Sequence, residues 1–338
     1  MKAKEYTFDA SYQPQVRTKT DTSRIMLDVI IALVPAMAVA VYQFGFRVLA
    51  LIVVSVLSCV FFEWGYRKLM KKPDSIGDLS ACVTGVLIAM VIPSGAPLWM
   101  PVVAAAFAMV VVKQLYGGIG KNFLNPALAS RAFLMASWPV IMTTWAVPKA
   151  LQGSIDATTM ATPLSYMKAG EALPDTLSTV NMFLGNVPGC IGEISALALL
   201  IGGAYLLIRK VISWRIPTAF IGTVAVLTFI FPMHGASNFN WMLTNLLSGG
   251  LLLGAFFMAT DYSSSPVTLN GQLLYGFGCG ALTVLIRYFG GFPEGVSYAI
   301  LIMNLCAWAI DKGTRGRQFG VTKEDLKAAK KAAKEAKA

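Results

Sequence analysis

Histidine is nearly absent from this sequence. His234 is the only one in 338 residues, so the chain alone cannot supply a bis-histidine haem or a multi-histidine metal site. Cysteine is also scarce: the five cysteines stand at positions 59, 82, 190, 279 and 306, and none are spaced like iron–sulfur ligands. We predict buried cysteines, no metal site and no complete active site. A single cysteine could still join a cluster shared between subunits. Redox chemistry in this chain would therefore need an organic cofactor.

Charged side chains are few as well. They make up 13% of the chain, while hydrophobic residues make up 56%; soluble domains carry about 25% charged residues. About ten apolar segments of roughly 14 to 22 residues can be drawn, against the ~20 residues that span a bilayer. They are Ile25–Phe44, Val48–Trp64, Leu79–Ile92, Leu98–Leu115, Pro126–Val147, Cys190–Ile208, Ile216–Phe231, Leu243–Thr260, Leu273–Phe289 and Val296–Ile310. The sequence therefore predicts an all-α, multi-pass membrane protein in the lipid bilayer.

The net charge of +11 is concentrated in alternate connections between these segments. Lys and Arg gather before residue 25, around residues 67–72, 113–121 and 209–215, and after residue 311, whereas intervening turns such as Pro93–Pro97 and Pro232–Trp241 carry none. This is the positive-inside pattern, and it accounts for the charge without nucleic-acid binding. It predicts cytoplasmic termini and an external loop at Pro148–Gly189. The connection Asp261–Gly271 has no Lys or Arg, and we place it inside because its neighbours require that.

Similar features recur about one half-chain apart. Leu79–Ile92 is followed by a Pro-Gly turn, and Leu243–Thr260 is followed by another polar turn. Five segments per half would give the halves opposite orientations, which is how many transporters build a site at the bilayer midplane. Chance similarity between Gly-rich segments is the alternative. The predicted divisions are residues 1–24 (cytoplasmic segment), 25–147 (first five-helix repeat), 148–189 (external loop), 190–312 (second five-helix repeat) and 313–338 (cytoplasmic tail).

The external loop contains a hydroxyl-rich run from Asp156 to Pro163. A threonine hydroxyl is a poor nucleophile without a neighbouring base, and no histidine is close in sequence, so we assign Thr162 no catalytic role. A phosphoester carrier needs only to be exposed and presented to a transferase. Pro163 favours an extended backbone at Thr162, and Asp156 is an acidic group available for recognition. An ordinary Ser/Thr turn is the alternative.

The run Asp156-Ala157-Thr158-Thr159-Met160-Ala161-Thr162 resembles the acceptor motif of flavin transferases, apart from Met160, which replaces a small residue. Longer motifs resemble the RnfD family, the D subunits of Rnf ferredoxin:NAD oxidoreductases. They are Ser23–Leu27, Lys113–Asn122, Phe123–Leu128, Gly185–Glu193, Gly254–Asp261 and Phe289–Val296. The resemblance covers essentially the whole chain. A related family is the B subunit of the sodium-translocating NADH:quinone reductase, in which an acid often replaces Gln114.

The resemblance implies a urea-transporter-like fold of ten helices in two inverted repeats. It implies FMN joined through its phosphate to Thr162, with Asp156, Thr159 and Ala161 in the recognition motif, and a second, non-covalent flavin such as riboflavin deeper in the protein. It further implies a translocase subunit in the bacterial cytoplasmic membrane, assembled with the A, B, C, E and G subunits of Rnf and matured by a flavin transferase. Its flavin would carry electrons between ferredoxin and NAD, coupled to Na⁺ or H⁺ movement.

Acids near the ends of apolar segments are further candidates. A charge at the bilayer centre costs at least ~2.5 kcal/mol, so such groups are functional hypotheses unless they lie at the interface. The resemblance favours Asp261 and Asp311 for coupling to cation movement; structural roles are favoured for Asp28 and Glu63. Two other functions stay open: a B-type quinone-reductase subunit, and a flavin-free channel or solute transporter of the same fold.

Overall fold

The computed structural model describes residues 21–73, 75–152, 159–233, 235 and 237–315. Throughout these residues the secondary structure is helical, and the β-structure in them is limited to two isolated bridges, Pro93 with Cys190 and Ala146 with Thr159. The predicted all-α class is confirmed for the described residues.

The first half of the chain forms two long helices and several shorter ones. After α3 the chain turns through residues 91–98, and α4 then continues directly as a π-helix, η2. The elements are α1 (Thr22–Phe44), α2 (Phe46–Leu69), η1 (Ile76–Asp78), α3 (Ser80–Met90), α4 (Trp99–Ala106), η2 (Phe107–Gln114) and α5 (Pro126–Ser137).

The segment between the halves is more ordered than a plain polar loop. It holds five short helices and a small core of its own, made by Val147, Leu151, Leu177, Met182 and Val187. The helices are α6 (Pro139–Met142), η3 (Lys149–Leu151), α7 (Pro163–Ala169), η4 (Asp175–Leu177) and α8 (Thr179–Leu184).

The second half also contains a helix that is interrupted. Ser248, Gly249 and Gly250 separate α11 from α12, both glycines have positive φ, and the axis bends by 59° there. After this break α12 continues as a π-helix, η5. The elements are α9 (Ala196–Ile208), α10 (Arg215–Ile230), α11 (Asn238–Leu247), α12 (Leu251–Leu253), η5 (Gly254–Met258), α13 (Leu269–Phe289) and α14 (Val296–Thr314).

Three described helices, α1, α2 and α13, are long and apolar enough to cross a membrane, and the bent pair α11 with α12–η5 makes a fourth if counted as one span. Other apolar helices are shorter, including α3 and α9. This is typical of a membrane protein, but it does not confirm ten spans. Both halves share a break followed by a π-helix, and their inverted relation stays a prediction.

Three predicted segments differ from the observed helices: one ends earlier, one begins later and one is interrupted. The helix predicted over Pro126–Val147 stops at Ser137, because Trp138 precedes Pro139 and leaves the helical conformation. The helix predicted from Cys190 begins only at Ala196, after a turn capped by Ser195. The segment Leu243–Thr260 is interrupted at its two left-handed glycines.

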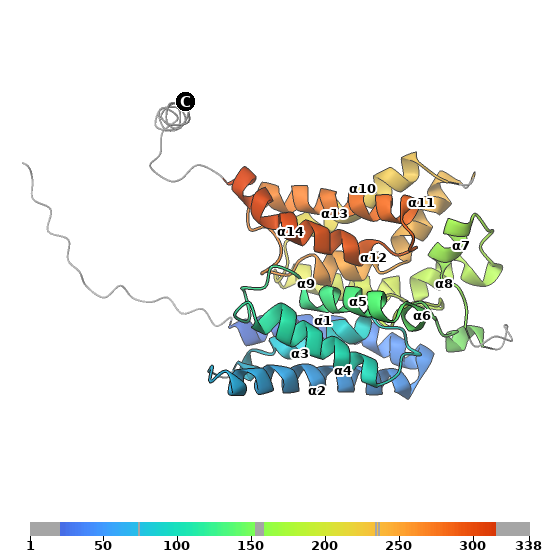
Figure 1. Cartoon of the computed structure of the whole chain (residues 1–338). Helices are drawn as coiled ribbons and strands as arrows, with labels where there is room; N and C mark the ends of the chain where they lie inside the picture. Colours follow the sequence, from blue (N-terminus) through green and yellow to red (C-terminus); the bar gives the residue numbers. More distant parts are fainter. Residues whose placement is uncertain (1–20, 74, 153–158, 234, 236, 316–338) are drawn as a thin grey trace, which may run out of the picture.

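The two halves pack against each other with α5, α9 and α12 between them (Figure 1). We call the end that carries α7 and α8 the loop end. The opposite end, where α1 begins and α14 ends, is called the terminal end. Close contacts rely on glycine: a Cβ at Gly202 of α9 would lie 2.1 Å from the Ala32 carbonyl oxygen of α1, and one at Gly85 of α3 would lie 2.6 Å from the Val56 Cα of α2.

This close approach predicts a large effect of one methyl group. Gly202→Ala should lower the thermal unfolding temperature of the purified protein, because overpacking costs about 1–3 kcal/mol. The matched control is Gly222→Ala in α10, where a Cβ would meet nothing within 4 Å. Alanine there should leave the midpoint unchanged or raise it, since helical glycine costs roughly 0.5–1 kcal/mol. Equal midpoints for both variants would contradict the assigned α1–α9 contact.

Candidate functional site

Thr162 is the N-cap of α7 at the loop end. Its backbone is extended, with φ −72° and ψ 156°, as predicted from Pro163. Its Oγ1 accepts a hydrogen bond from the Ser165 backbone N–H at 3.3 Å and shares another with Ser165 Oγ at 2.9 Å. The residue is only 4% exposed. The expectation of an exposed hydroxyl is therefore wrong for this folded state, in which the hydroxyl caps a helix.

The neighbours of Thr162 are better exposed. Thr159 and Ala161 are exposed, and the Met160 N–H donates to the Trp145 carbonyl at 3.1 Å. Asp156 lies outside the described residues. The structure thus places Thr159, Ala161 and Thr162 along one segment, and their role in flavin attachment stays a prediction.

A cavity of about 380 Å³ lies beside this segment, and we call it the loop cavity. That volume is within the range of roughly 300–1,000 Å³ found for ligand pockets. Ser165 and Ala161 line it, so the Thr162 hydroxyl is one hydrogen bond from its wall. The described lining residues are Met135, Thr143, Thr144, Trp145, Thr159, Met160, Ala161, Ser165, Phe292, Pro293 and Glu294. The turn Phe292–Glu294 was part of a motif, but no local pattern indicated that it faces the threonine segment.

Behind the loop cavity, arginine and glutamate side chains are buried together. Arg131 forms an ion pair with Glu294, and both side chains are under 10% exposed. Arg287 is also buried and donates to the Asn245 carbonyl at 2.6 Å and the Ser248 carbonyl at 3.1 Å. Both arginines are therefore partnered inside the protein and do not face lipid headgroups.

The turn before α9 joins this cluster to the helix breaks. The backbone N–H groups of Ile191 and Gly192 donate to the carbonyls of Ile92 and Met90, at 3.2 and 2.8 Å. Glu193 Oε1 accepts from the Cys190 N–H at 2.8 Å. This glutamate therefore stabilises its own turn, and α9 begins later, capped by Ser195.

A second buried cluster is centred on Glu63 of α2, which is fully buried. Lys113 Nζ lies 3.1 Å from its Oε2, and Gln114 Nε2 donates to its Oε1 at 2.9 Å. Lys113 also donates to Ser80 Oγ at 2.6 Å. The amide of Gln114 thus serves as a donor to a carboxylate. Asp28, by contrast, joins the halves through Arg209 of the second half at 3.2 Å.

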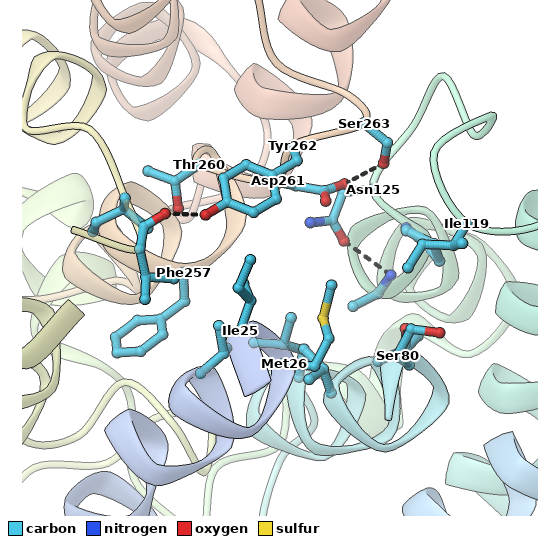
Figure 2. Close-up of a pocket in the computed structure, with 18 of the residues that line it drawn as sticks. Ile25, Met26, Ser80, Ile119, Asn125, Phe257, Thr260, Asp261, Tyr262 and Ser263 are labelled. Carbon is cyan, nitrogen blue, oxygen red and sulfur yellow. Dashed lines mark hydrogen bonds between the residues drawn. The ribbon is translucent and has the colours of Figure 1, made fainter. Parts of the chain in front are cut away.

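Asp261 lies in the wall between two cavities at the terminal end. Its Oδ2 accepts from Ser263 Oγ at 3.1 Å and Ser264 Oγ at 3.0 Å. One cavity, of about 110 Å³, also contains Lys113, Ser80 and Tyr262 in its wall. Figure 2 shows Asp261, Tyr262 and Ser263 across that cavity from Ile25 and Met26. The other, of about 460 Å³, reaches Asp311.

Asp261 follows the last helical residues of the broken segment and lies in the connection to α13. Burial raises the pKa of its carboxyl, and the hydroxyls of Ser264 and Ser263 oppose this by stabilising the carboxylate. The group therefore binds a proton at higher pH than an exposed aspartate does.

Asp311 is held differently. Its carboxylate accepts from the backbone N–H groups of Val267 and Thr268 at 3.1 and 3.0 Å, and from Thr268 Oγ1 at 3.0 Å. Those groups stand at the start of α13, so Asp311 of α14 caps another helix. Asp311 therefore stabilises the start of α13, and its role in ion movement stays a prediction.

The chain was also compared with known proteins. The family model described as the NQR2, RnfD, RnfE family matches residues 9–320. The chain belongs to this family. It is 50% identical to the D subunit of the Na(+)-translocating ferredoxin:NAD(+) oxidoreductase complex of Acetobacterium woodii over 324 residues, covering 94% of this chain and 97% of that relative.

Two further relatives agree with this assignment. The D subunit of the proton-translocating ferredoxin:NAD(+) oxidoreductase complex of Clostridium ljungdahlii is 41% identical over 325 residues, covering 94% of this chain and 97% of the relative. The D subunit of the ion-translocating oxidoreductase complex of Actinobacillus succinogenes is 34% identical over 348 residues, covering 93% and 98%. The predicted resemblance to the D-subunit family is confirmed.

The capping role of Asp311 can be tested by two substitutions. Asp311→Ala should lower stability by about 1 kcal/mol, as loss of a helix cap does, whereas Asp311→Asn keeps an acceptor oxygen and should lose less. Thermal unfolding of both variants measures this. Ion-dependent electron transfer by the assembled complex should survive in Asp311→Asn. Loss of ion dependence with an unchanged unfolding midpoint would instead assign the carboxylate a direct role in ion movement.

Proposed function

We propose that this chain is the membrane-embedded D subunit of an ion-translocating ferredoxin:NAD oxidoreductase complex in the bacterial cytoplasmic membrane. It would carry electrons through FMN esterified to Thr162. The similarity to D-subunit proteins along nearly the whole chain supports the complex. The observation that supports the flavin is that residues 159–162, the described part of the acceptor motif, lie beside the loop cavity.

The residues around the loop cavity fit a flavin in part. Trp145 and Phe292 offer apolar and aromatic surface for a planar ring, and Thr143, Thr144 and Thr159 offer hydroxyl groups. The Thr162 hydroxyl must leave its cap before a phosphoester can extend into the cavity, at a cost of about 1 kcal/mol. When bound, the flavin would supply reversible electron transfer. The chain's own residues would hold the ring and limit its contact with water.

The proposed site is on the external side of the membrane. The loop end contains the described residues of the segment 148–189, which the positive-inside pattern places outside. Both termini would then be cytoplasmic, and electrons reaching Thr162 would return inward towards the NAD-reducing partner. Other Rnf subunits would supply the donor and acceptor, and a flavin transferase would attach the FMN.

If a second, non-covalent flavin such as riboflavin binds this chain, we place it at the terminal end. The cavity beside Lys113 holds about 110 Å³, which is smaller than the ~300 Å³ minimum of ordinary ligand pockets. The neighbouring cavity of about 460 Å³ is large enough and has Phe123, Tyr262 and Trp308 in its wall. It is therefore the better fit for a planar ligand.

Energy permits the proposed coupling. Two electrons that fall through ~100 mV release roughly 4.6 kcal/mol. Moving a monovalent cation against ~100 mV requires about 2.3 kcal/mol, so roughly two cations could be moved. Asp261 is the proposed coupling residue because it lines both terminal-end cavities.

Intact-mass analysis tests the flavin attachment. The chain made together with the flavin transferase should gain the mass of one esterified FMN, and Thr162→Ala should not. Thr158→Ala is the matched control, since it removes another hydroxyl of the same run outside the recognition residues Asp156, Thr159 and Ala161, and it should keep the modification. An unmodified wild-type chain would favour a flavin-free channel or transporter. A modified chain that reduces quinone in place of NAD in its complex would indicate the B-type subunit.

The role of Asp261 is tested by Asp261→Asn in the assembled complex. The amide still accepts from the two serine hydroxyls but cannot ionise. We expect the FMN to be retained and electron transfer to become at least tenfold less responsive to added Na⁺ or to a proton gradient. Ser264→Ala is the control that removes one donor and keeps the acid. Unchanged ion dependence in Asp261→Asn would exclude Asp261 from the ion path.

A further inference from the structure

Two glutamates meet inside the protein, one in the wall of the loop cavity and one deeper. Glu193 comes from the turn before α9, and Glu294 comes from the turn between α13 and α14. A carboxylate oxygen of each and the sulfur of Cys190 all lie within 4.8 Å of one another. Glu193 is 6% exposed, and the Glu294 side chain is 9% exposed. Neither residue has a role in the flavin attachment or ion path proposed above.

Each carboxylate has one oxygen without a donor. Glu193 Oε1 accepts from the Cys190 N–H, and Glu294 Oε2 pairs with Arg131. The other two oxygens, Glu193 Oε2 and Glu294 Oε1, are buried and have no hydrogen-bond partner among the described residues. Leaving a buried polar atom unsatisfied costs about 1–3 kcal/mol. Because an oxygen of each carboxyl lies within 4.8 Å of the other, one proton placed on either carboxyl would let it donate a hydrogen bond to its neighbour.

We infer that Glu193 and Glu294 form a proton-binding carboxyl pair that exchanges its proton through the loop cavity. The equilibrium is simple: two carboxylates and one proton give one carboxylic acid hydrogen-bonded to one carboxylate. No electron, leaving group or other reactant is needed for it.

The surrounding charges favour a proton over a metal ion. Arg131 of α5 already neutralises Glu294, and Arg287 of α13 lies across the Gly249–Gly250 turn from Glu193. The other titratable groups facing the pair and its arginines are the Cys190 thiol and the hydroxyls of Tyr288 and Tyr298. A calcium ion needs six to eight oxygen ligands, whereas only two carboxylate oxygens are free here.

The pair connects the cavity with the interior. Glu294 is the only acid among the described residues that line the loop cavity. Glu193 lies deeper, with its unpartnered oxygen against Gly250, where a Cβ would stand 2.7 Å away. A proton can thus pass between a group in the cavity and the junction of the two helix breaks. One consequence rests on the proposed function: the pair would balance charge when a flavin on Thr162 accepts electrons.

Infrared spectroscopy of the full-length protein over a pH titration tests the pair. Wild type should show the carbonyl stretch of a buried, protonated carboxyl at neutral pH, where exposed acids are ionised, and the band should shift in D₂O. Glu193→Gln should remove it, because glutamine donates to Glu294 directly and no proton is required. Glu294→Gln should remove it for the same reason.

Glu63→Gln is the matched control: it changes a buried glutamate whose oxygens are both partnered, and it should keep the band. Thr162→Ala should keep it too, so failure of the flavin proposal would not remove this signal. Glu193→Gln preserves the acceptor for the Cys190 N–H and should fold even if Glu294→Gln, which deprives Arg131 of its partner, does not. A carbonyl region unchanged by Glu193→Gln at every pH where the protein is folded would overturn the inference and assign the two free oxygens to water.

Discussion

A helix that ends inside an apolar interior leaves carbonyl groups that need donors, and this requirement organises the centre of the molecule. The chain stops α3 at Met90, and the donors come from the turn at Ile191 and Gly192, which belongs to the other half. In a membrane no water is available to replace them, so the two segments must meet for either to be stable. Several features lie around this contact. They are the buried pair of Glu193 and Glu294 with Arg131 and Arg287, the glycine-rich break after α11, and the wall of the loop cavity formed by Glu294.

Buried charges in this protein serve as connections between distant segments. Arg131 reaches Glu294, and Lys113 reaches Glu63. Removing one partner of such a buried pair leaves a charge that is costly in low dielectric, by about 3–5 kcal/mol, whereas an apolar replacement of both can be neutral. Arg209 reaches Asp28 with its side chain 55% exposed, so solvent screens that pair. These pairs therefore specify which helices lie together more than they add to stability. The pair from Arg209 to Asp28 and the contact at Gly202 both join α9 to α1.

The sequence predicted the fold class and the long apolar helices well, and it predicted the positions where helices are interrupted less well. Apolar length and scarce charge predicted α1, α2 and α13 closely, since a long apolar run has few alternatives. The end of α5 at Ser137 and the interruption at Gly249 depend on single residues within apolar runs, where composition gives little warning. Pro163 predicted the extended Thr162, but burial of its hydroxyl depends on Ser165 and on packing of the whole loop. The meeting of Glu193 with Glu294 is a tertiary contact that no local pattern encodes.

Thr162 has two uses that compete for one oxygen atom. In the folded chain its Oγ1 holds the first turn of α7, and in the proposed mature protein the same atom carries a phosphoester. In that proposal a transferase would reach the oxygen only while the first turn is open, so a local unfolding equilibrium would limit the rate of loading. Loading would then be fastest before neighbouring segments pack over α7, and the proposed order of biogenesis is the cofactor first and the final packing of the loop second.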